Sequence, residues 1–324
     1  MKRRALLMIP VLLVGGWLLA EPLLVRQARV QIAEIAELSV TGIKAQPGTD
    51  RLGLYLEGIA WDDGLRFLDM PALDLWVTPL TPTTIRATLP DTVTYGDRMG
   101  ATNLAATEGR ASLRLWPFGG EVSFAAVDVG SLSLDGQPLT GKGNVSARLA
   151  NIGDGPGQAV SSYDLDLAVS QPGDAGPLLQ GKAQVWLDGK LDAAAASQAV
   201  PPRVLGVSTE GMEIGGAGFA GRIAGRVTAD AEGLAEGQVA IYSRDAAPLI
   251  DAAIDAGILS QNIRVLANTM LNRIGHMDFA SGADTGFPAA AEGELRLPVE
   301  FRDGRMFLGT IEVGPAFRLA DPAS

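Results

Sequence analysis

Apolar and polar residues alternate along most of the chain from Leu52 onward. Within residues 52–56 every second residue is a leucine, and the alternation returns at Leu73, Leu75 and Val77. A period of two places successive side chains on opposite faces of a strand, so each segment is expected to have one apolar and one polar face. This is typical of antiparallel sheets, since parallel strands are buried on both faces. The pattern recurs in segments that begin at Ala111, Leu132, Val145, Leu165, Val185, Val227, Val239 and Leu295.

Turn sequences stand between these segments, as in Asp135-Gly136, Asp188-Gly189 and Asp303-Gly304. Asp-Gly pairs favour tight hairpins, because the central residues of such turns need positive φ angles. We therefore predict a mainly β protein built on a long, curved antiparallel sheet, a meander of hairpins over residues 39–324. The alanine- and proline-rich stretch Asp192–Pro202 is either a linker between two β lobes or an exposed loop, and we favour the loop because strand patterning resumes after it.

A helical spacing replaces the alternation between residues 245 and 275. Asp245 is placed to cap a first helix and Gly257 to end it, while Ser260 and Gly275 frame a second. We predict a C-terminal helical hairpin here. Its apolar stripes are expected to complete a core against the sheet, and the alternative is a lid or contact surface for a lipid or partner.

The N-terminus carries a membrane-targeting pattern. Three basic residues precede the uncharged, mostly aliphatic stretch Ala5–Ala20, as in a signal peptide or signal anchor. Leu18 and Trp17 make a poor cleavage site, so we favour a retained transmembrane helix over residues 1–25 to a cleaved signal. The positive flank places the remainder outside the cytoplasm, which predicts a single N-terminal pass through the inner membrane and a periplasmic body. Residues 26–38 have helical apolar spacing and are expected to form an amphipathic helix.

Composition excludes several classes of function. A formal net charge of −11 disfavours nucleic-acid partners. The absence of cysteine excludes disulfides and thiolate ligands, and a single histidine, His276, leaves no basis for a histidine metal site or a histidine-dependent triad. We expect no cofactor, no metal and no catalytic residues.

Two local patterns resemble functional motifs but lack the context that such motifs require. Gly216, Gly218 and Gly221 spell the dinucleotide-binding string, but the residues after Gly221 have strand character where a helix is required. The carboxylate pair Asp164 and Asp166 alternates with the leucines of its segment, which is typical of solvated surface charge rather than acid and base catalysis.

The C-terminal third resembles a known bacterial envelope family. The resemblance lies in Val239–Leu259, in Leu297–Arg305 through Gly309, and in Val313–Leu319, although Phe317 stands where the family pattern suggests a second proline. These segments are similar to the family known as domain of unknown function 2125. The resemblance implies an inner-membrane-tethered, periplasm-facing β protein, loosely similar in plan to AsmA-like envelope proteins that handle lipid, and it assigns no catalytic residues.

A continuous apolar face on a long sheet must be covered by something. Our leading hypothesis is a trough that binds or shields lipid or another apolar envelope component, lined by Leu54, Leu56, Leu73, Leu75 and Leu113. The alternative is a structural or scaffolding module with a closed core that docks an envelope protein without a ligand.

Overall fold

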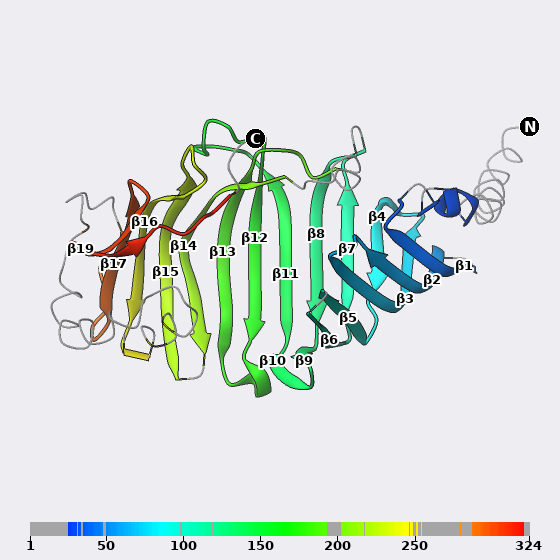
Figure 1. Ribbon diagram of the computed structural model, residues 1–324, viewed down its shortest axis with the longest axis horizontal. Helices are drawn as coiled ribbons and strands as arrows, with labels where there is room; N and C mark the ends of the chain where they lie inside the picture. Colours follow the sequence, from blue (N-terminus) through cyan, green and yellow to red (C-terminus); the bar gives the residue numbers. More distant parts are fainter. Residues whose placement is uncertain are drawn as a thin grey trace, which may run out of the picture. The chain divides into compact units, whose positions relative to one another are not determined.

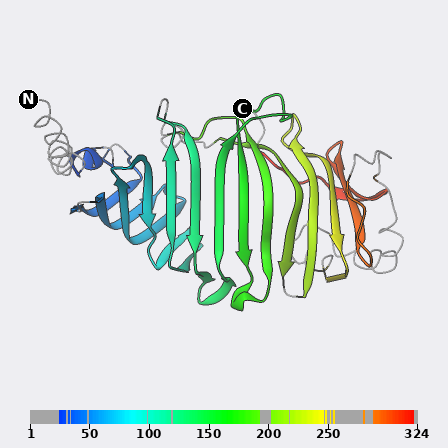
Figure 2. The ribbon, with the colours of Figure 1, turned by 180° about the vertical axis from the view of Figure 1, so that it is seen from behind.

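A computed structural model describes most of the chain between residues 25 and 320. The described residues are 25–30, 32–33, 35–47, 50–97, 99–117, 120–192, 202–216, 218–245, 247–248, 251, 254, 279 and 287–320. They form nineteen strands, and the chain divides into two compact units, unit 1 (Met1–Gly143) and unit 2 (Asn144–Ser324). The prediction of a mainly β, antiparallel protein is confirmed, because the strand pairs of both units are antiparallel (Figures 1 and 2).

Unit 1 contains a sheet that forks at its longest strand. Its strands are β1 (Leu38–Pro47), β2 (Leu52–Asp62), β3 (Arg66–Thr78), β4 (Thr81–Thr88), β5 (Thr92–Asp97), β6 (Gly100–Thr107), β7 (Arg110–Leu115), β8 (Val122–Val129), β9 (Ser131–Leu134) and β10 (Gln137–Thr140). Strand β3 pairs with β4 near its C-terminal end and with β5 near its N-terminal end. One branch continues through β7 to β8, and the other through β6 and β9 to β10.

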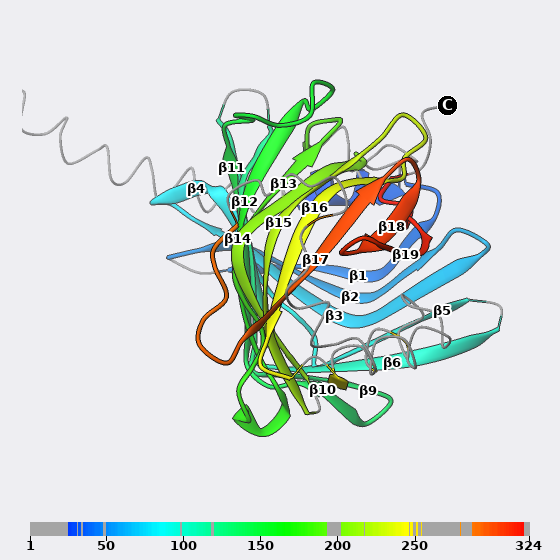
Figure 3. The same cartoon turned by 90° about the vertical axis from the view of Figure 1, so that its left-hand side faces the viewer.

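This fork departs from the predicted succession of hairpins. Strand β3 is long enough to pair with β4 along one part and with β5 along another. Strand β4 then pairs with β7, and β5 pairs with β6. Figure 3 shows β2 and β3 bent along their length. Alternation within each strand predicts the face of every residue but contains no information about which distant strand will be its neighbour.

Unit 2 is a meander from β12 to β19. Its strands are β11 (Gly143–Ala150), β12 (Ser161–Ser170), β13 (Pro177–Leu187), β14 (Val204–Gly216), β15 (Phe219–Ala229), β16 (Ala235–Ser243), β17 (Leu295–Arg302), β18 (Arg305–Leu308) and β19 (Ile311–Pro315), with the short 3-10 helix η1 (Pro172–Asp174) between β12 and β13. From β12 onward each strand pairs with the next one along the chain. These strands lie side by side from β12 to β16 (Figure 1).

The C-terminal end of unit 2 packs apolar side chains on both faces of its sheet. On one face Phe301, Met306 and Ala316 form a buried cluster with residues of β15 and β16. On the other face Phe279 contacts Tyr242, whose hydroxyl donates a 2.6 Å hydrogen bond to the carbonyl of Pro288. Burial on both faces gives this end of unit 2 a packed core of its own.

Several predicted features fall outside the described residues. They are the N-terminal segment 1–24, nearly all of the predicted helical hairpin 245–275 with His276, and most of the stretch Asp192–Pro202. Helical positions occur at residues 25–30 and 32–33, within or beside the predicted amphipathic helix, and Leu38 already begins β1. The described residues contain no helical hairpin and no helix that is both long and apolar enough to cross a membrane.

Candidate functional site

One row of residues crosses six neighbouring strands of unit 1 and is apolar at every position. The register connects β1 to β2, β2 to β3, β3 to β4, β4 to β7 and β7 to β8. Residues directly opposite each other share a face, with Cβ atoms about 5 Å apart. The row, called the apolar row below, consists of Ala45, Leu54, Leu75, Ala87, Ala111 and Val127.

The structure brings the five leucines predicted as a lining onto this same face. Leu54 lies opposite Leu75, and Leu56 lies opposite Leu73 in the neighbouring register. Leu113 lies on β7, two residues from the row, opposite Ile85 of β4. Leu56 is buried, and the other four leucines are half-buried. The sequence did not indicate that Ile85, Ala87 and the residues of β8 would join them.

The adjoining row on the other face of these strands is mainly polar. The row that follows the apolar row by one residue reads Lys44, Tyr55, Asp74, Thr88, Arg110 and Asp128. Lys44 forms a 2.6 Å ion pair with Glu57 on this face. The two faces therefore differ in polarity at the level of the apolar row, although the second face also carries apolar side chains further along the strands, among them Ile59, which is 5% exposed.

The described residues of unit 1 form no packed apolar cluster of the kind found in unit 2. Within the described part of the chain, all three clusters of buried apolar side chains belong to unit 2. Val127, at one end of the apolar row, is 42% exposed, and Leu54 and Leu75 remain partly accessible. Leu54, Leu73, Leu75 and Leu113 thus keep part of their apolar surface accessible on this face, whereas Leu56 and Ala87 are buried.

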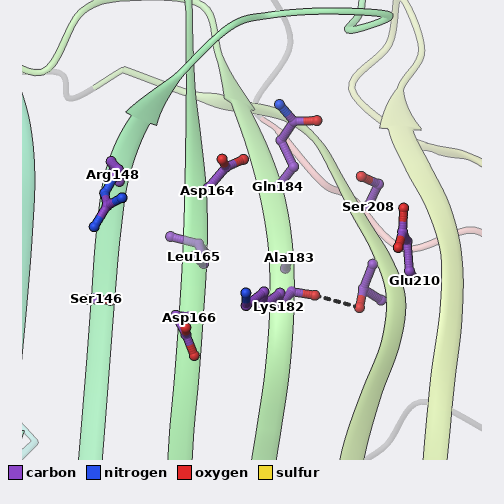
Figure 4. A pocket seen from close by; sticks show the side chains of 11 residues that line it. Ser146, Arg148, Asp164, Leu165, Asp166, Lys182, Ala183, Gln184, Ser208 and Glu210 are labelled. Atoms are coloured by element: carbon purple, nitrogen blue, oxygen red, sulfur yellow. Dashed lines mark hydrogen bonds between the residues drawn. The ribbon is translucent and has the colours of Figure 1, made fainter.

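A polar groove in unit 2 was not expected from the sequence. It has a volume of about 580 Å³ and is formed by strands β11 to β14. Figure 4 shows the charged and polar side chains that line it, among them Arg148, Asp164, Asp166, Lys182, Gln184, Ser208 and Glu210. Asp166 lies opposite Lys182, and Gln184 lies between Asp164 and Ser208 in the register. The carboxylate pair set aside as surface charge therefore faces this groove.

The groove brings together charges of both signs. The described residues contain no group of three or more histidine, cysteine or carboxylate side chains placed to hold a metal ion. The groove has no histidine or cysteine, and the hydroxyl of Thr209 is used in a 2.7 Å hydrogen bond to the backbone carbonyl of Lys182. Opposite charges on neighbouring strands are typical of a solvated sheet face. The arrangement follows from the register between successive strands, which the residue pattern alone does not give.

Among the described residues, the carboxylates of Asp63 and Asp188 have lowered pKa values, and both have structural roles. Burial raises the pKa of Asp188, but hydrogen bonds from the side chain and backbone of Arg203, together with its charge, outweigh that effect and hold the pKa below its ordinary value. The pKa of Asp63 is lowered by hydrogen bonds from the backbone amides of Arg66 and Leu65 in the β2–β3 turn. Neither group lines the apolar row or the polar groove.

The glycine string lies where the sequence reading placed it, in a β turn. Gly216 ends β14, Gly218 has a φ of 92°, and Gly221 lies within β15 opposite Ile214. The residues after it continue as strand, so the backbone amides are used in the β14–β15 ladder.

Comparison with known proteins gives one family. A model of the family described as "Uncharacterized protein conserved in bacteria (DUF2125)" matches residues 59–316. The chain belongs to this family. The DUF2125 match confirms the resemblance first seen in the C-terminal third, and it extends from β2 of unit 1 to the last residues of unit 2. No curated protein and no solved structure matches the chain.

Proposed function

We propose that this DUF2125 protein is anchored to the inner membrane by its N-terminal segment and binds lipid, or another apolar envelope component, on the apolar row of unit 1. The observation that carries the proposal is that the row is apolar at every position from β1 to β8, while the neighbouring row on the other face is polar.

The row has the dimensions of a hydrocarbon chain. Six strands at a spacing of about 4.8 Å extend over about 24 Å. One leaflet of a bilayer is about 15 Å of hydrocarbon, so an acyl chain lying across the strands fits within the row. Each methylene removed from water contributes about 0.8 kcal/mol. A partner of this kind needs no specific polar contact to bind.

The proposed location rests on the sequence of the N-terminus. The basic start and the uncharged stretch Ala5–Ala20 favour a retained membrane helix with the cytoplasm on its N-terminal side. That orientation places both units in the periplasm, where the absence of cysteine causes no loss. The predicted helical hairpin 245–275 would add apolar surface to unit 2 in the same compartment.

The test compares retained lipid between matched variants of the full chain. The protein is extracted from bacterial membranes in mild detergent, washed, and analysed by native mass spectrometry for bound phospholipid or lipopolysaccharide. Leu54→Asn combined with Leu75→Asn is expected to lose the adduct, because a bound acyl chain would cover two polar amides and remove their water. Tyr55→Asn combined with Thr88→Asn changes the polar face of the same strands and is expected to retain it.

The rival scaffolding function predicts a different result. A wild-type chain that carries no lipid but copurifies with a defined envelope protein would overturn the lipid proposal. Equal loss of lipid from both variants would also contradict it, since the lipid would then not lie on the apolar row.

A further inference from the structure

Two neighbouring turns at one end of unit 1 present large apolar side chains to solvent. Leu65, in the β2–β3 turn, is 65% exposed, and Met99, in the β5–β6 turn, is 94% exposed. Each turn is held by an aspartate that accepts backbone hydrogen bonds. Asp63 accepts one from Leu65 at 2.8 Å, and Asp97 accepts one from Met99 at 2.7 Å. These bonds fix the turns with their apolar side chains outward.

The two turns lie side by side and have aromatic residues behind them. Arg66, which follows the first turn, pairs with Asp97, which precedes the second. Two residues further along these strands, Leu68 lies opposite Tyr95 on one side and opposite Trp61 on the other. Tyr95 is 47% exposed. Exposed apolar side chains at the turns, with aromatic residues next to them on the strands, are typical of a membrane interface, where Trp and Tyr lie at headgroup level.

The chain enters unit 1 at this same end. Leu38, the first residue of β1, lies opposite Trp61, and the amide of Asp62 donates a 2.9 Å hydrogen bond to the carbonyl of Glu37. In the segment that leads to β1, Val30 is 47% exposed and Ile35 is 41% exposed. The uncharged stretch that ends at Ala20 precedes this segment closely in the sequence.

We propose that this end of unit 1, the docking end, rests in the interface of the phospholipid bilayer, with Leu65 and Met99 inserted among the headgroups. The docking end is defined by Leu65, Met99, Tyr95 and Trp61. The inference rests on the membrane tether of the proposed function and adds the face that the tether brings to the bilayer. Interfacial insertion places such side chains within about 5–10 Å of the boundary between headgroups and acyl chains.

The charge of the docking end makes insertion a hydrophobic rather than an electrostatic interaction. In the sequence of the two turns and the residues beside them, Asp62, Asp63 and Asp97 stand against Arg66 and Arg98, which leaves one net negative charge. A surface of this sign gains nothing from anionic lipid. Contact with the membrane should therefore be the same on zwitterionic and on anionic vesicles.

The opposite end of unit 1 provides an internal control. Leu80, in the β3–β4 turn, is 94% exposed, as is Met99, and Trp116 beyond β7 is 54% exposed. Exposure alone thus does not distinguish the two ends. Only the docking end lies beside the start of β1, so only its side chains are expected to reach the lipid.

Single cysteines test the proposal directly, because the chain has no cysteine of its own. Full-length Met99→Cys, Leu65→Cys and Leu80→Cys variants are labelled with an environment-sensitive fluorophore and reconstituted into vesicles of phosphatidylcholine, or of phosphatidylcholine with phosphatidylglycerol. The labels at positions 99 and 65 should shift their emission to the blue and be quenched by lipid-attached nitroxides. The label at position 80 should do neither, and the results should be equal on both lipid compositions.

Failure of the tether and failure of the docking end give different results. A chain that does not float with the vesicles would overturn the membrane tether and the docking end with it. A chain that floats while positions 65 and 99 stay unquenched would overturn the docking end and leave the tether in place. Equal quenching at positions 80 and 99, or quenching on anionic vesicles alone, would also overturn it.

Discussion

Replacing Leu75 by asparagine distinguishes an open apolar face from a packed core. Leu75 lies in the middle of the apolar row, between Leu54 and Ala87, and is half-buried. Complete burial of a leucine contributes about 1.5–3 kcal/mol, so a half-buried leucine on an open face should cost about 1–2 kcal/mol when it is lost. Asparagine has a similar size, and its amide stays hydrated when no lipid is bound, which adds no further penalty.

Leu297 of unit 2 is the matched control for a closed core. It is 2% exposed and belongs to a cluster with Leu308. Leu297→Asn removes the packing of the leucine and also buries an amide away from water. The free energy of unfolding should therefore fall by about 4 kcal/mol or more.

Hydrogen exchange of lipid-free protein, read on peptides from the substituted unit, measures both costs as losses of opening free energy. A Leu75→Asn cost as large as that of Leu297→Asn would refute the open face. It would favour the scaffolding alternative, in which the sheet of unit 1 is fully packed.

Two further substitutions test the structural account of unit 2. Asp188→Asn should cost about 1 kcal/mol at neutral pH, because the partly exposed carboxylate is hydrogen-bonded to the backbone and side chain of Arg203. Because the pKa of Asp188 is lowered in the folded protein, this stabilisation is complete above the ordinary pKa of 3.8 and is lost as the pH falls through the folded value. The urea midpoints of wild type and variant should therefore converge in acid. A difference that stays constant with pH would contradict the assignment. Gly225→Ala should cost about 1–3 kcal/mol, because Gly225 has a φ of 148° and a Cβ there would lie 2.4 Å from the carbonyl oxygen of Gln238. Gly100→Ala, which meets nothing within 4 Å, should leave the urea midpoint unchanged, and equal effects of the two would show that backbone crowding is not the cause.

The alternation of side chains was sufficient to predict several strands and their faces, among them β2, β3 and β7, but it did not indicate β1, β4, β5, β6 or β8. Leu54 and Leu75 fall on one face of β2 and β3 because every second residue of each strand points the same way, and the register then places them opposite each other. The turn at Asp135-Gly136 was also predictable, and both residues have the positive φ angles, 48° and 79°, that an Asp-Gly hairpin requires.

Long-range pairing was beyond the reach of the sequence pattern. The fork at β3 depends on pairings between strands that do not follow one another along the chain, as between β3 and β5 and between β4 and β7. The same holds for the docking end, where Leu65 and Met99 become neighbours only because Arg66 pairs with Asp97. In the sequence, a single leucine in a turn does not indicate an interface, because isolated exposed apolar residues are common on protein surfaces.

Photocrosslinking from adjacent positions of β2 tests the central claim most directly. Benzoylphenylalanine replaces Leu54, on the apolar face, or Tyr55, on the polar face, in full-length protein in bacterial cells. If unit 1 carries an acyl chain across its apolar row, illumination yields a lipid adduct from position 54 and none from position 55. Adducts with protein alone, or equal lipid adducts from both positions, would contradict it.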